Sequence, residues 1–143
     1  MKKILLFLLF SPLTMVSQKL KCEDFKNGNF TMTCDKFPNI IITMSRYDDV
    51  QTETLLKNES SIVDLGTEII YEKIEWLSDC KYKLMFDFTK SKETELMKYL
   101  NDNGGVITSI IKIEDHCYLY ESILIIDGKK EKLSGEICKD INY

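Results

Sequence analysis

Residues 74–84 read IEWLSDCKYKL, and this stretch carries the clearest hairpin pattern in the chain. Ile74 and Trp76 alternate with polar residues before Ser78-Asp79, a pair that favours a tight turn. After the turn the alternation resumes, with one side formed by Cys80, Tyr82, Leu84, Phe86 and Phe88. Because side chains of a strand point alternately to opposite faces, these aromatic and sulfur side chains are expected on the face that a sheet buries.

The same period of two recurs along most of the chain. It predicts strands near residues 30–34, 39–46, 50–56, 68–76, 80–88, 106–113, 117–126 and 131–139. Asp127-Gly128 is the strongest of the turn signals between them. Residues 91–101 instead have helical spacing, with Ser91 suited to the N-cap position. The sequence therefore predicts an all-β domain with one inserted helix.

About six to eight antiparallel strands in sequence order form a meander. Such a sheet either closes into a small lipocalin-like barrel or curls strongly under the helix. Closure removes the exposed strand edges that promote aggregation, which favours the barrel. No internal repeat or linker divides the chain, so residues 18–143 are expected to form a single β-rich domain.

Residues 1–17, MKKILLFLLFSPLTMVS, have the basic start, short apolar run and small polar end of a signal peptide. The run from Ile4 to Phe10 is shorter than the roughly 20 apolar residues of a transmembrane helix. We therefore expect export to the periplasm or the medium, with no membrane span after cleavage.

The charge of the chain argues against nucleic-acid binding. Lys and Arg number 19 against 23 Asp and Glu, and loss of Lys2 and Lys3 with the leader would take the net charge from −4 to about −6. Binding to nucleic acids rests on basic residues that neutralise phosphates, and the mature chain has no basic cluster.

The five cysteines, Cys22, Cys34, Cys80, Cys117 and Cys138, predict disulfides in an exported protein. An odd number leaves at least one thiol free or paired between chains, and spacing alone leaves the pairing open. The chain has one histidine and no CxxC pair, so neither a zinc site nor any cofactor is predicted.

Two groups of residues are candidates for a binding site. Trp76 and Tyr82 could form the floor of an apolar pocket, although a core anchor is the more common role of such aromatic residues. Arg46, Gln51 and Glu53 fall on one predicted hairpin, where they could hold a charged ligand group if they point inward. The alternative for these three is a cross-strand ion pair at the surface.

Catalysis has less support. A nucleophilic Cys80 would need a base, and His116, the only histidine, lies in a predicted turn beside Cys117. A hydrolase would need a cleft in which Glu53, Arg46 and His116 converge.

Several of these residues together resemble a family. A group of small exported bacterial proteins shares a pattern that is matched here by Cys22, Phe25, Gly28, Phe30, Arg46, Gln51, Glu53, Trp76, Asp79, Cys80, Tyr82 and Leu84. The resemblance covers Cys22 to Leu84, about half of the mature chain, and the group has no established activity. It implies a disulfide between Cys22 and Cys80, the two cysteines of the shared pattern, and leaves Cys34 with Cys117 or Cys138 as a second pairing.

Some members of the group carry the label DNA topoisomerase IV. A strand-passing enzyme needs large domains, a basic DNA track and a nucleotide site, whereas this chain is short, acidic and without a phosphate-binding glycine loop. The physical properties of the sequence contradict that label.

We therefore expect a noncatalytic exported β-domain that binds a small apolar ligand or a protein partner. The alternative is an interaction or inhibitor-like module that acts from an exposed edge or loop without a pocket. An enclosed apolar cavity near Trp76 would favour the first, and a filled core with an exposed apolar patch the second.

Overall fold

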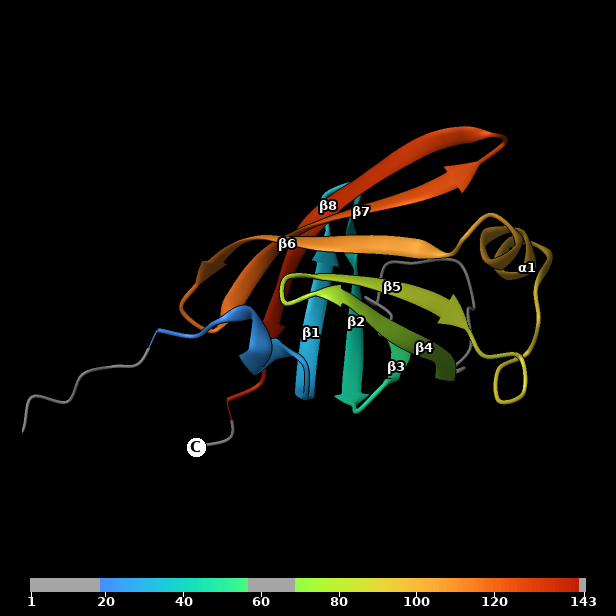
Figure 1. Ribbon diagram of the computed structural model, residues 1–143. Helices are drawn as coiled ribbons and strands as arrows, with labels where there is room; N and C mark the ends of the chain where they lie inside the picture. Colours follow the sequence, from blue (N-terminus) through green and yellow to red (C-terminus); the bar gives the residue numbers. More distant parts are fainter. Residues whose placement is uncertain (1–18, 57–68, 142–143) are drawn as a thin grey trace, which may run out of the picture.

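The computed structural model describes residues 19–56 and 69–141, and their strands form one closed antiparallel barrel. Each strand pairs with the next along the chain, and the last pairs with the first (Figure 1). The elements are the 3-10 helix η1 (Cys22–Phe25), β1 (Gly28–Cys34), β2 (Phe37–Tyr47), β3 (Val50–Leu56), β4 (Ile69–Ser78), β5 (Lys81–Phe86), α1 (Glu95–Asp102), β6 (Val106–Glu114), β7 (Cys117–Ile126) and β8 (Lys129–Lys139). The predicted all-β fold with one inserted helix is confirmed, and the barrel is the form adopted.

The strands keep the period of two that their sequences show. In β7, Tyr118 and Tyr120 are buried inside the barrel, whereas Leu119 and Ile123 lie on the outer surface and are exposed. The turn to β8 places both Asp127 and Gly128 at positive φ, as a two-residue hairpin turn requires and as this dipeptide tolerates.

The barrel closes where β1 pairs with β8. Cys34 lies opposite Gly135 there, and a Cβ atom on Gly135 would fall 2.1 Å from the carbonyl oxygen of Thr33. Only glycine fits such a close approach of two backbones. The Tyr120 hydroxyl on β7 donates a hydrogen bond to the same carbonyl at 3.2 Å, which links β7 directly to β1 across the inside of the barrel.

The helix η1 closes one end of the barrel. Phe25 is fully buried there, and its ring meets that of Tyr118 edge-on, with 4.9 Å between the centroids. Cys22 is bonded to Cys80, in the turn between β4 and β5. The disulfide that the family resemblance implied is therefore present, and it fastens η1 to the barrel.

A second disulfide joins Cys117 to Cys138, and Cys34 is free. The pairing of Cys34 with Cys117 or Cys138 is therefore wrong. The reason is register, because Cys117 and Cys138 lie directly opposite each other on β7 and β8, whereas Cys34 lies opposite Gly135. Two disulfides fit an oxidising compartment.

Helix α1 is shorter than residues 91–101 and begins later. Thr94, not Ser91, is its N-cap, and the Thr94 hydroxyl accepts a hydrogen bond from the Met97 N–H at 3.2 Å. The Ser91 side chain instead bonds both backbone groups of Tyr71, accepting from its N–H and donating to its carbonyl. A contact with a distant strand thus overrides the local capping preference.

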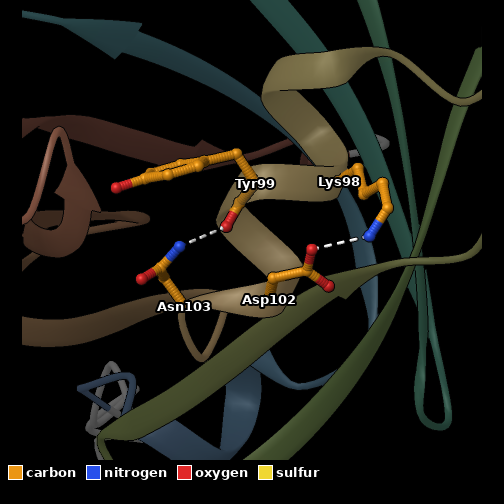
Figure 2. Close-up of polar contacts among 4 residues, drawn as sticks. All are labelled: Lys98, Tyr99, Asp102 and Asn103. Carbon is orange, nitrogen blue, oxygen red and sulfur yellow. Dashed lines mark hydrogen bonds and ion pairs between the residues drawn. The ribbon is translucent and has the colours of Figure 1, made fainter.

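Figure 2 shows the last two turns of α1. Lys98 pairs with Asp102 at 2.6 Å, and the Asn103 side chain donates to the Tyr99 carbonyl at 2.8 Å, which satisfies one of the last carbonyls of the helix. The Tyr99 ring extends from the helix, and its hydroxyl accepts a hydrogen bond from the Gly128 N–H at 3.0 Å. The helix is therefore tied to the turn between β7 and β8.

The predicted signal peptide, residues 1–17, lies outside the described residues, and export stays a prediction. Over the ranges 19–56 and 69–141, no helix is long and apolar enough to cross a membrane.

Candidate functional site

The inside of the barrel holds a cavity of about 340 Å³. All eight strands and α1 contribute to its walls, and the helix covers one side through Thr94, Leu96, Met97 and Leu100. The strand residues that line it are mostly apolar, with the polar exceptions Arg46, Gln51, Glu53, Glu72, Tyr82, Thr108, Tyr120 and Ser122. The cavity is thus an apolar space with a small number of polar groups at defined places.

The polar groups lie deep in the barrel because of the strand register. Arg46 on β2, Gln51 on β3 and Glu72 on β4 are direct neighbours across the three strands, and all three are buried. Glu53 lies two residues further along β3, on the same face, and is half-buried. Alternation along neighbouring strands therefore gathers one cation, one amide and two carboxyl groups.

Arg46 donates five hydrogen bonds. Its Nε donates to Gln51 Oε1 at 2.7 Å, and one terminal nitrogen donates to the Phe25 carbonyl and to the Tyr118 hydroxyl at 3.2 and 3.0 Å. The other terminal nitrogen donates to the Tyr82 hydroxyl at 2.7 Å and to the Met44 sulfur at 3.6 Å. The guanidinium also lies over the Tyr82 ring, 4.6 Å from its centroid. Such contacts support a buried charge that would otherwise be costly.

Gln51 connects Arg46 to the two carboxyl groups. Its oxygen accepts from Arg46, and its nitrogen donates to Glu53 Oε1 at 2.7 Å and to Glu72 Oε2 at 2.8 Å. The Arg46 contact fixes which end of the amide is the oxygen. The Gln51 side chain therefore links the guanidinium and the carboxyl pair in one hydrogen-bonded network.

The carboxyl groups of Glu53 and Glu72 are hydrogen-bonded to each other and form a pair. Burial, reinforced by the neighbouring Glu53 carboxylate, raises the pKa of Glu72 well above its usual range. Burial also raises the pKa of Glu53, against the attraction of Arg46. Two carboxylates in such a place favour holding one proton between them, with Glu72 as the protonated partner.

The two tyrosine hydroxyls beside Arg46 lie 3.1 Å apart. Burial and the neighbouring Tyr82 raise the pKa of Tyr118 well above its ordinary value. The hydroxyl therefore stays protonated at neutral pH and serves as a neutral hydrogen-bonding partner of Arg46.

The residues considered for catalysis do not meet in this cavity. Cys80 is bonded to Cys22 and has no thiol to offer as a nucleophile. His116 is exposed in the turn between β6 and β7 and is not part of the cavity wall, so it does not converge with Arg46 and Glu53.

The predicted binding residues are placed as follows. Arg46, Gln51, Glu53 and Tyr82 all line the cavity, and the first three point inward instead of forming a surface ion pair. Trp76 is half-buried and is not part of the cavity wall. Its ring packs against the Tyr82 ring, with 4.9 Å between the centroids.

Sequence reasoning missed Glu72 and Tyr118. A signal for Glu72 was available, because it lies two residues before Ile74, and a strand places both side chains on the same face. A carboxylate on that face of a strand is unusual unless it has partners. The partners themselves come from another strand and appear only in the folded structure.

No protein-family model matches the chain, and a comparison with curated proteins finds no match either.

Proposed function

We propose that this protein is an exported binding protein that holds a small, largely apolar molecule inside its barrel. The observation that carries the proposal is the cavity of about 340 Å³ with mostly apolar walls. Ligand sites typically occupy about 300–1,000 Å³ and use a few polar groups to orient an apolar body. An engineered cavity of only about 150 Å³ in another protein is enough for benzene, so this one has room for a larger molecule.

The arrangement of the walls supports one orientation of the ligand. Apolar residues such as Phe86, Leu124 and Leu133 lie in the half of the barrel toward α1, while Arg46 and Gln51 lie toward η1. A ligand with one polar group would place that group beside the buried network and its apolar body against α1.

The methionines of the mature chain provide the test. Met32, Met44 and Met97 line the cavity, whereas Met85 does not. We expect the apolar fluorophore N-phenyl-1-naphthylamine to bind with increased fluorescence and to shift the NMR signals of the first three ¹³C-labelled methyl groups. The Met85 methyl serves as the internal control and should move little.

A shift of Met85 alone, or no response of any methyl group to the fluorophore, would contradict the proposal. A larger side chain inside the barrel gives a second test. Thr108→Phe, on the cavity wall, should weaken binding of the fluorophore, whereas Lys112→Phe, at an exposed position of the same strand, should not.

The second candidate is a module that binds a protein partner on its outer surface. Ile111 and Leu119 favour it, because both are apolar and exposed on the outer face of β6 and β7, at 61% and 38%. Closure of the barrel leaves the described strands without a free edge, so the partner would have to dock on this face or on a loop. This candidate would lead if the methionine methyl groups inside the barrel failed to respond.

A further inference from the structure

The N–H donors of Arg46 and Gln51 are all in use. A guanidinium has five N–H groups, and those of Arg46 have five acceptors within the chain: Gln51, Phe25, Tyr118, Tyr82 and Met44. Both N–H groups of the Gln51 amide donate to the carboxyl pair. A ligand that enters the cavity therefore finds neither Arg46 nor Gln51 free to donate.

The spare capacity of the network is that of an acceptor. Each of Glu53 and Glu72 has two oxygens with about four lone-pair sites. Gln51 occupies one site on each, and the hydrogen bond between the two carboxyl groups uses one more on each, which leaves acceptor sites free. Both residues lie on the cavity wall. The ligand group that complements this place is therefore a hydrogen-bond donor and not a carboxylate or phosphate.

The charge balance of the cavity wall further narrows the chemical class of the ligand. Among the residues that the structure describes, the charged ones on the cavity wall are Arg46, Glu53 and Glu72, so two carboxyl groups share one buried cation there. The second negative charge is neutralised by a proton, consistent with the raised pKa of Glu72. An alcohol could donate a hydrogen bond here but would leave the proton in place. A ligand with a positively charged group could instead take the place of this proton.

We propose, on the basis of the binding function above, that the ligand is an apolar amine whose ammonium group takes the place of the proton held between Glu53 and Glu72. The ammonium donates to the carboxylate oxygens, and its apolar body extends toward α1. The displaced proton passes to solvent, so the cavity stays neutral, with two cations facing two carboxylates. Charge-assisted hydrogen bonds of this kind are stronger than neutral ones.

Three probes with one body and different heads provide the test: n-octylamine, n-octanol and n-octanoate. Binding is measured by displacement of N-phenyl-1-naphthylamine and by calorimetry. We expect octylamine to bind at least about tenfold more tightly than octanol, and octanoate to bind most weakly. Calorimetry in two buffers with different heats of ionisation should find about one proton released per octylamine and none per octanol.

The pH dependence follows from the same exchange. Within residues 19–56 and 69–141, the titratable and charged groups that face Glu72 are Glu53 on β3 and Arg46 on β2. As pH rises toward the raised pKa of Glu72, releasing the shared proton costs less free energy. The affinity for octylamine should therefore increase, while the affinity for octanol stays constant. The ammonium itself stays charged until about pH 10.

Glu72→Gln is the decisive variant, with Glu75→Gln as its match, since Glu75 lies on the same strand but is exposed and paired with Lys83. We expect E72Q to lose about tenfold or more in octylamine affinity and to keep its octanol affinity within about twofold, which also verifies the folded cavity. E75Q should match the wild type with both probes.

The possible failures are distinct. If octanol binds as tightly as octylamine, if octanoate binds best, or if E72Q weakens octylamine and octanol equally, the amine inference is overturned and the binding function stands. If neither the fluorophore nor any octyl probe binds, the binding function itself fails.

Discussion

Glu72 illustrates how a single buried residue can make stability depend on pH. The carboxyl group is 3% exposed, and burial with the nearby Glu53 carboxylate raises its pKa above the ordinary value of 4.5. Between 4.5 and that raised pKa, the folded protein binds a proton that the unfolded chain has released. The free energy of unfolding must therefore fall as pH rises through this range.

We expect the wild type to be more stable near pH 4.5 than at the upper end of this window, with a loss of at most about 1.4 kcal/mol per pH unit for one proton. Glu72→Gln should remove this loss, because glutamine does not titrate. Urea unfolding over a pH series measures the difference, with the exposed Glu75→Gln as the control. If the free energy of unfolding changed with pH in the same way in E72Q and the wild type, the assignment of the proton to Glu72 would be contradicted.

At the scale of elements, the position of α1 depends on the Asn101 side chain, which bonds the backbone of β5 as a neighbouring strand would. Asn101 accepts a hydrogen bond from the Phe86 N–H and donates one to the Phe86 carbonyl, both at 2.9 Å. The pairing of β5 with β6 ends at Leu84 and Val106, and these two bonds continue it to Phe86, the last residue of β5. They hold the helix against the cavity.

We expect Asn101→Ala to lower the free energy of unfolding by about 1–3 kcal/mol, because two backbone groups of Phe86 lose their partner. Amide hydrogen exchange at Phe86 should accelerate in this variant. Asn103→Ala is the comparison, since the Asn103 side chain bonds only within its own helix and its loss should leave Phe86 protected. Equal protection of Phe86 in N101A would show that α1 is held elsewhere.

At the scale of the whole molecule, the two disulfides differ in what they connect. Cys22–Cys80 spans 58 residues and fastens the η1 segment over the end of the barrel, whereas Cys117–Cys138 spans 21 residues within the β7–β8 hairpin. On the chain-entropy model, a longer closed loop restricts the unfolded chain more.

We expect the paired serine variant of Cys22 and Cys80 to lose about 4 kcal/mol of stability, and that of Cys117 and Cys138 about 3 kcal/mol. Urea unfolding of both variants, followed by the fluorescence of Trp76, measures the order. A thiol reagent should label the wild type once, at Cys34, without reductant. The reverse order of stability would indicate that η1 packs well without its disulfide.

Most of the fold could be predicted from local patterns in the sequence. Alternation in β5 predicted that Tyr82, Leu84 and Phe86 lie inside, and Asp127-Gly128 predicted one hairpin, since both are properties of nearby residues. The helix boundary was misplaced at Ser91 because that side chain bonds the backbone of Tyr71, which is 20 residues away.

The sequence by itself therefore determined the fold class and the inward side of Tyr82, because a strand's period of two needs no knowledge of its neighbours. It left open whether Arg46, Gln51 and Glu53 point inward, and the structure places all three on the cavity wall. Only the tertiary structure decided that Glu72 completes the network, that Cys117 bonds Cys138, and that a cavity remains at the centre. These features depend on register and barrel closure, which bring together atoms from strands that are far apart in the chain.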